Sequence, residues 1–253
     1  MRFVSSHDGQ LQYLGQGESP KRGGGVFSTG LEAIDRLVPG GLARGAIHEV
    51  LVPPGQTMAM SFALVLARSA AGGSASGEAC GQGGGEALGG CHAMVWCDPD
   101  QRLYPPAIAA AGVPLDRFYL IRPGNEPQLV WALAECLRCK GIGAVVGPVG
   151  RLSMIEARRL QLAAEQGGGV GLLLRSIGKV SAHYAAATRW LVEPAGGQRT
   201  VQRWKVQLIH GQGGRVNQAV LLEVCRETHT VRAARTLADR PVAAPAPSIR
   251  IAG

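Results

Sequence analysis

The segment AIHEVLVPPGQTMAMSFALVLARSAA, residues 46–71, decides the fold that we expect for this 253-residue chain. Its first seven residues, Ala46–Val52, form a short apolar run rich in β-branched side chains. A helix-forming stretch without glycine or proline follows at 57–71. The proline-proline-glycine tripeptide at 53–55 separates the two as a tight turn. The segment therefore predicts a buried strand, a tight loop and a helix.

The same alternation continues along the chain. Expected strands lie at 93–97, 118–121, 144–146, 170–174, 190–193, 201–210 and 216–227, and expected helices at 105–111, 126–140 and 154–166. Apolar strands that alternate with helices are typical of a parallel sheet covered on both faces. The last two strands are joined at 211–214 like a hairpin. We therefore expect an α/β fold with a mostly parallel β-sheet, helices on both faces and antiparallel C-terminal strands.

Three segments of low complexity divide the chain. Residues 1–25 are polar and end in three glycines, which indicates a flexible N-terminal arm. Residues 71–92 consist mainly of Gly, Ala and Ser, so they predict a mobile loop inserted into one core domain at 26–232. Residues 233–253 are rich in proline and alanine and predict a disordered tail.

The charge balance bears on partners and location. Lys and Arg number 26 against 18 Asp and Glu, a net charge of +8 that attracts nucleic acid or acidic protein surfaces. The excess is spread along the chain, so weak nucleic-acid binding and an arginine-rich coding bias both explain it. No apolar run approaches a membrane span and no secretory signal begins the chain. We expect a cytoplasmic protein without membrane association.

The six cysteines are expected to be reduced thiols in that compartment. Only Cys136 and Cys139 have a spacing typical of metal ligands. They lie inside a predicted helix, and no second pair stands at the spacing of a zinc ribbon. Free helix cysteines are therefore preferred over a zinc site, and no metal is expected.

The loop after the first strand is where nucleotide phosphates usually bind in such a sheet. A phosphate-binding loop reads G-x-x-x-x-G-K-[ST], with Lys for phosphate charge and a hydroxyl for Mg²⁺. Here the eight positions hold Val52, Pro53, Pro54, Gly55, Gln56, Thr57, Met58 and Ala59. Met58 occupies the Lys position and Ala59 the hydroxyl position, while the two prolines lack N–H donors. We expect a degenerate nucleotide loop that binds no ATP and no other cofactor.

The residues before this loop resemble RecA-like recombinases. FSTGLEAID at 27–35 and PGGLARGAIHEV at 39–50 are similar to the segment that leads into the phosphate loop of those proteins. Within that superfamily the chain resembles the ImuA family, the RecA-like mutagenesis proteins of the bacterial DNA-damage (SOS) response. RRLQLAAE at 158–165 and AATRW at 186–190 carry this second resemblance. The similarity extends over about residues 26–227.

The resemblance also locates the other catalytic positions of a recombinase. The magnesium-binding Asp would follow the strand at 144–146, where Gly147 stands. The acidic residue that orients the attacking water would fall on Asp100, a residual carboxylate. The strand end that carries a Gln sensor for the γ-phosphate reads Leu174-Arg175-Ser176. A single carboxylate without lysine or metal cannot stabilise phosphoryl transfer, so we expect a pseudo-ATPase.

The ImuA resemblance implies a non-catalytic adaptor in translesion synthesis. Its implied partners are ImuB, a homologue of Y-family polymerases, and an error-prone DNA polymerase; RecA and single-stranded DNA are further candidates. Two alternatives stay open. One is an SOS inhibitor of cell division that binds the tubulin-like division GTPase. The other is a divergent DNA-dependent ATPase in which Arg44 or Arg68 replaces the missing lysine.

Basic residues are the candidate contacts of such an adaptor. Arg158 and Arg159 lie on the helix at 154–166, whose Ile155, Leu160, Leu162 and Ala163 are expected to face the core. The two arginines form either a solvated face paired with Glu156 or Glu165, or a patch for DNA phosphates or an acidic partner.

A second group lies between two predicted strands, where RecA-like proteins place a DNA-binding loop. It comprises Arg175, Lys179, Tyr184 and Arg189, which suit single-stranded DNA if Tyr184 stacks on a base. An ordinary connection with Tyr184 packed on the sheet is the alternative. Glu49, in the buried strand, is expected to be a hydrogen-bonded structural carboxylate.

Overall fold

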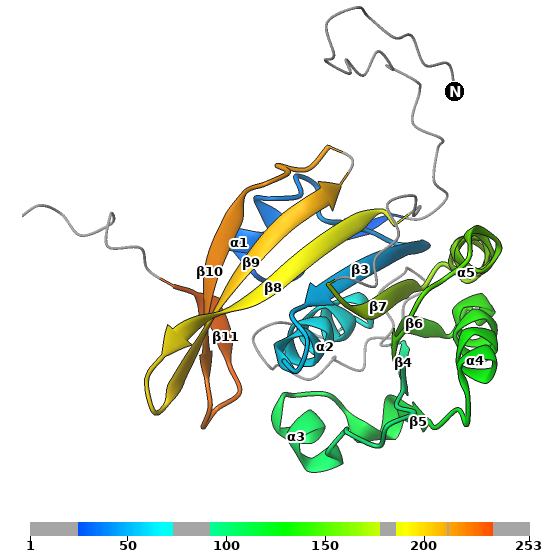
Figure 1. Ribbon diagram of the computed structural model, residues 1–253, viewed down its shortest axis with the longest axis horizontal. Coiled ribbons are helices and arrows are strands. Elements are labelled where there is room, and N and C mark those ends of the chain that lie inside the picture. The colour runs from blue at the N-terminus through cyan, green and yellow to red at the C-terminus, as the bar shows by residue number, and fades with distance from the viewer. Residues whose placement is uncertain (1–24, 73–91, 178–185, 212, 235–253) are drawn as a thin grey trace, which may run out of the picture.

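The computed structural model describes residues 25–72, 92–177, 186–211 and 213–234. These residues form a large sheet in the order β11-β10-β9-β8-β3-β7-β6-β4-β5 (Figure 1). Its strands are β3 (Ala46–Val52), β4 (Ala93–Cys97), β5 (Phe118–Ile121), β6 (Ile142–Pro148), β7 (Val170–Ser176), β8 (Thr188–Gly197), β9 (Val201–Gly211), β10 (Ala219–Cys225) and β11 (Val231–Ala233). The six strands from β5 to β8 are parallel to their neighbours, and β9, β10 and β11 follow antiparallel. The expected sheet is confirmed.

Helices lie on both faces of this sheet, as the sequence predicts. They are α1 (Glu32–Asp35), α2 (Met58–Ala70), α3 (Pro105–Ala110), α4 (Glu126–Arg138) and α5 (Met154–Gly167), with a short 3-10 turn at Leu115–Arg117. One apolar core lies between α1, α2 and the sheet, where the Phe62 ring meets Trp190 edge-on at 6.0 Å between centroids. The other core lies under α4 and α5 (Figure 1).

The C-terminal strands extend the first core beyond the parallel part of the sheet. Trp204 and Leu208 of β9 and Leu222 of β10 are buried in the same cluster as Phe62. β8 is longer than the strand predicted at 190–193. Its more buried and less buried residues alternate, so only one side of the strand faces the core and its full length does not read as an apolar run. β11 and the two-stranded sheet of β1 (Val26–Phe27) and β2 (Leu42–Ala43) escape prediction, since two or three residues carry no periodicity.

The prediction that Ile155 and Leu162 face the core is wrong. Their exposed fractions are 82% and 47%, whereas Leu160 is fully buried. The buried residues of α5 are Ala157, Leu160, Gln161, Ala163 and Ala164, and the first, second, third and fifth of them are spaced i, i+3, i+4 and i+7. Leu162 follows Leu160 by two residues, about 200° around the helix, so it lies on the opposite side.

Several predictions fall outside the described residues and stay predictions. They concern almost all of the N-terminal arm, the inserted loop and the tail, together with Lys179 and Tyr184. In the part of the chain that the structure covers, no helix combines the length and the apolar character needed to cross a membrane.

Candidate functional site

The loop between β3 and α2 is a closed turn. Gln56 N–H donates to the Pro53 carbonyl at 3.2 Å, Pro54 stands at the second position and Gly55 has φ +79° at the third. Proline followed by a residue with positive φ is the signature of a type II turn. Met60 N–H, in the first turn of α2, donates to Thr57 O at 2.9 Å. Two positions of the loop therefore lack a donor, and a third uses its N–H within the turn.

The side chains of the lysine and hydroxyl positions are part of the apolar core. Met58 and Ala59 are 5% and 2% exposed and pack in the cluster that holds Phe62. Gln56 and Thr57 are exposed, and the Thr57 hydroxyl makes no capping hydrogen bond to α2. The loop therefore presents one amide, one hydroxyl and no charge to solvent.

The end of the neighbouring strand β6 carries no carboxylate side chain. A Cβ at Gly147 would lie 3.0 Å from Leu133 Cδ2 and 3.2 Å from Cys97 Cβ, so this position faces α4. Because side chains alternate along a strand, Pro148 holds the position on the α2 side. Neither residue offers a carboxylate to the loop.

Asp98 and Asp100, in the segment after β4, have different environments. Asp100 is exposed and pairs with Arg102 at 3.3 Å. Asp98, which the sequence did not single out, is 4% exposed and accepts the N–H groups of Arg102 and Leu103 at 3.0 and 2.9 Å. Asp98 therefore holds the turn, and Asp100 is a solvent-exposed carboxylate.

Arg44 and Arg68 lie at the wrong end of α2 to replace the missing lysine. Arg68 follows Met58 by ten residues, about 15 Å along the helix axis, and its Nη1 donates to Ala111 O at 2.9 Å. Arg44 donates to Ala70 O at 2.8 Å and lies over the Phe27 ring. Burial lowers the pKa of both guanidinium groups, with desolvation as the cause.

Arg175 and Arg189 meet a buried carboxylate. Arg175 Nη1 and Arg189 Nε donate to the two oxygens of Glu49, whose side chain is fully buried. Arg175 also donates through Nη2 to Gly150 O at 3.0 Å. The expected structural role of Glu49 is confirmed. Arg175 is 2% exposed, so its assignment to a surface loop for DNA is wrong, because the residue belongs to β7 and faces the interior.

A second buried polar group lies beside this cluster on β3. His48 Nε2 donates to Ala43 O at 2.9 Å, and its Nδ1 lies 2.8 Å from Thr188 Oγ1. Trp190 Nε1 donates to the same Thr188 oxygen at 2.8 Å. The Thr188 hydroxyl can donate to His48 while it accepts from Trp190, so the three groups tie β3 to β8.

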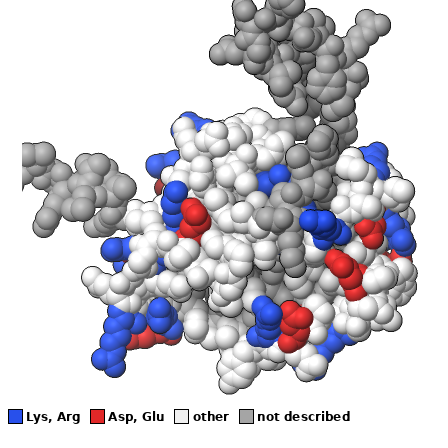
Figure 2. Space-filling view, in the orientation of Figure 1, with Lys and Arg blue, Asp and Glu red and all other residues white. Residues whose placement is uncertain are grey.

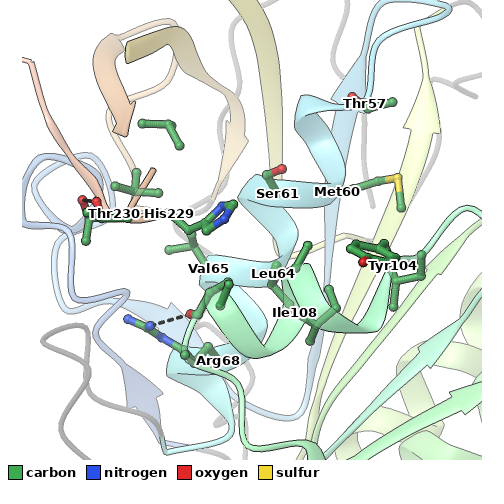
Figure 3. A pocket seen from close by; sticks show the side chains of 18 of the residues that line it. Thr57, Met60, Ser61, Leu64, Val65, Arg68, Tyr104, Ile108, His229 and Thr230 are labelled. Carbon is green, nitrogen blue, oxygen red and sulfur yellow. Dashed lines mark hydrogen bonds between the residues drawn. The ribbon is translucent and has the colours of Figure 1, made fainter. Parts of the chain in front are cut away.

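A pocket of about 530 Å³ lies along the exposed side of α2 (Figure 3). Figure 3 shows Thr57 and Met60 at one end of the α2 wall, Arg68 at the other, and His229 with Thr230 across from it. Trp204 also lines the pocket; its Nε1 is buried and has no hydrogen-bond partner among the described residues. Most of the lining residues are apolar and none is Asp or Glu, so the pocket suits an apolar group and offers no carboxylate for Mg²⁺.

Arg158 and Arg159 are both exposed on α5. Their expected partners are engaged elsewhere, because Glu156 accepts from Ser153 and Glu165 accepts from Gln161 Nε2 at 2.9 Å. Figure 2 shows other basic side chains dispersed over the visible face, several of them beside acidic ones. Among the predicted contact residues that the structure describes, these two adjacent arginines are therefore the exposed ones.

The cysteines show no metal geometry where the structure describes them. Cys139 ends α4 and its thiol donates to Glu135 O at 3.4 Å. Burial, helped by the charge of Cys136, raises the pKa of the Cys97 thiol to about 12. Within the described ranges, no three side chains of His, Cys, Asp or Glu gather as a metal site.

Comparison with known proteins finds a similarity to Protein ImuA. The chain is 29% identical over 238 residues to Protein ImuA from two strains of Caulobacter vibrioides. The matched region covers 87% of this chain and 93% of those proteins. No protein-family model matches the chain.

Proposed function

We propose that this chain is a member of the ImuA family, as its similarity to Protein ImuA supports, and that it is a non-catalytic adaptor of damage-induced mutagenesis. In this role it would act with an ImuB-like homologue of Y-family polymerases and an error-prone DNA polymerase during translesion synthesis. RecA and single-stranded DNA are further candidate partners. The work of such a protein is recruitment through surfaces.

The burial of Met58 is the observation that carries the proposal. Phosphoryl transfer needs a cation at the β- and γ-phosphates and a carboxylate for Mg²⁺. The side chain at the lysine position is apolar and packs in the core, and Gly147 and Pro148 end β6 without a carboxylate. The cation for the phosphates and the carboxylate for Mg²⁺ are therefore both replaced by uncharged residues.

The closure of the loop supports the same proposal. An anion site at a helix N-terminus uses several backbone N–H groups that point at the ligand. Here two positions are prolines, and Gln56 N–H is already bonded to Pro53 O. A triphosphate would have to open this turn and would find only Gln56 and Thr57 side chains there.

Nucleotide binding and hydrolysis test the catalytic half of the proposal. A fluorescent ATP analogue is titrated with Mg²⁺, and phosphate release is followed with and without single-stranded DNA. We expect no saturable binding up to about 1 mM nucleotide, a free energy near −4 kcal/mol, and no DNA-stimulated release. Stoichiometric binding at micromolar nucleotide would overturn this half.

Co-purification tests the recruiting half. The full chain is co-expressed with the ImuB-like protein and the error-prone polymerase of the same organism, each with a different tag. We expect a complex that survives size-exclusion chromatography and needs no added nucleotide. If neither protein is retained, with or without DNA damage, the adaptor role is refuted.

A further inference from the structure

We propose that the outward surface of α5 binds an acidic amphipathic helix of a protein partner. This α5 surface comprises Met154, Ile155, Arg158, Arg159 and Leu162, with Arg138 of α4 beside them. The inference deepens the proposed function and rests on it in one respect, namely that the chain works through a protein partner.

Three apolar side chains of the α5 surface are exposed to solvent. Met154, Ile155 and Leu162 are 62%, 82% and 47% exposed. They line a groove of about 480 Å³ together with Ala163 and the stems of the arginines. An apolar patch rimmed by polar groups is typical of an interaction site, since covering it removes this area from water.

The basic part of the surface lacks counter-charges. Within the described residues, the side chains of Arg158 and Arg159 form no hydrogen bond and no ion pair. The nearest acidic residues of the helix are occupied, Glu156 by Ser153 and Glu165 by Gln161. Arg138 alone is neutralised, through Glu135. The charge that complements this surface is therefore negative, and none of the residues that the structure describes supplies it.

The mixture of side chains favours a protein over DNA. Single-stranded DNA needs aromatic side chains on which bases stack, and no aromatic residue lines the groove. Duplex phosphates need arginines but gain nothing from Ile155 and Leu162 between them. A helix with an apolar stripe and flanking carboxylates satisfies both parts, because guanidinium groups bind carboxylates in a bidentate way.

The geometry of α5 matches such a helix. Ile155, the arginine pair at 158–159 and Leu162 are spaced i, i+3/i+4 and i+7 along one side. Ile155 and Leu162 are thus about 10 Å apart along the axis, two turns of a partner helix as well. α5 itself is held in place by a capping box at Ser153 and by Gly168 in the left-handed conformation at its end. The surface is therefore preorganised for docking.

A defined peptide tests the inference without any natural partner. The probe is a fluorescein-labelled helix of about 20 residues, rich in glutamate, with leucines spaced i, i+3, i+4 and i+7. Its control has the same composition with the leucines distributed around the helix. We expect the full chain to bind the amphipathic peptide with a Kd on the order of 10–100 µM and the control at least tenfold more weakly.

Variants of the chain locate the site. Arg158→Glu/Arg159→Glu and Ile155→Ser/Leu162→Ser each alter exposed side chains, and each should weaken peptide binding at least tenfold while the thermal transition is kept. Arg122→Glu/Arg226→Glu is the control, because it makes the same change in net charge at two other exposed arginines. A lysine-rich version of the peptide should bind Arg158→Glu/Arg159→Glu in preference to the wild type.

Three results would overturn the inference. They are an absence of saturable peptide binding, equal binding by the wild type and Arg158→Glu/Arg159→Glu, and a loss of single-stranded oligonucleotide binding in that variant with peptide binding unchanged. The last result would identify a nucleic-acid site. Because the ImuB-like protein takes no part in this assay, failure here leaves the co-purification result independent.

Discussion

Arg175 Nη1 lies 2.5 Å from Glu49 Oε1, and both side chains are completely buried. Leu51 of β3 is the direct neighbour of Arg175 on β7, so the ion pair runs diagonally between two parallel strands. Arg189, opposite Glu49 on β8, holds the second carboxylate oxygen. One carboxylate on β3 thus binds a guanidinium group from the strand on each side and ties the centre of the sheet together.

Arg175→Met should destabilise the protein by about 3 kcal/mol, because Glu49 would remain buried with half of its charge uncompensated. Gly150 O would lose its hydrogen bond from Arg175 as well. Urea unfolding followed by circular dichroism measures the loss. The double variant Glu49→Gln/Arg175→Met should lose less than the sum of the two single variants. Additive losses would mean that the two side chains do not interact.

The order of strands and helices follows from local signals, and this is why it could be predicted. Ala46–Val52 is fully buried, as its mostly apolar composition suggests, and the proline-proline-glycine turn ends it. Gly168, with φ +80°, caps α5 just beyond the end of the helix predicted at 154–166. These features depend only on residues close in sequence.

The environment of single polar residues could not be predicted in the same way. Arg175 follows an apolar run, which suggests a loop, but the register of β7 against β3 places it beside Glu49, 126 residues away. Ile155 illustrates the opposite error, because an apolar residue at a helix start suggests burial. Both depend on tertiary neighbours that a local pattern does not contain.

Met58→Lys should not restore nucleotide binding. The side chain at position 58 lies in the core with Phe62, so a lysine there is buried or forces the first turn of α2 to open. We expect the free energy of unfolding to fall by about 2 kcal/mol or more. Equilibrium dialysis with ATP and Mg²⁺ should show no gain over the wild type. A gain of micromolar binding from this one change would show that the loop retains a phosphate-binding geometry.

Ser153→Ala should loosen the start of α5. Ser153 Oγ accepts the Glu156 N–H at 3.2 Å, and Glu156 Oε2 accepts the Ser153 N–H at 2.8 Å. Removing the hydroxyl should cost about 1 kcal/mol. Hydrogen exchange should show faster exchange in the first turn of α5 and none of this change in α4. If the α5 surface docks a helix, peptide binding should weaken in parallel, since Met154 and Ile155 lie in that turn.

Two hydrogen bonds from Ser153 lower the pKa of Glu156. The backbone N–H of Ser153 is the larger cause and its hydroxyl is the smaller one. A carboxyl whose pKa is lowered by folding contributes stability above its unfolded pKa and loses it as the pH falls through the folded value. The difference between wild type and Ser153→Ala should therefore be full at neutral pH and shrink below about pH 4.5. A difference that stays constant down to pH 3 would assign the effect to the hydroxyl alone.

Cys97 should make the folded chain less stable at high pH. Burial, with the charge of Cys136 as a lesser cause, raises the pKa of its thiol from 9.0 to about 12. Between these values the unfolded chain releases the thiol proton and the folded chain keeps it, so stability is unaffected below about pH 9 and falls as the pH rises toward 12. Cys97→Ala should lower the stability at pH 8 by leaving a small cavity, yet flatten the decline of stability between pH 9 and pH 10.5.

Thiol labelling provides a second measurement of the buried state of Cys97. Because the thiolate is the reactive form, iodoacetamide at pH 8 should label exposed Cys139 in the folded protein and Cys97 only as urea unfolds it, which peptide mass spectrometry can follow. Equal labelling of both thiols without urea would contradict the buried, protonated state of Cys97.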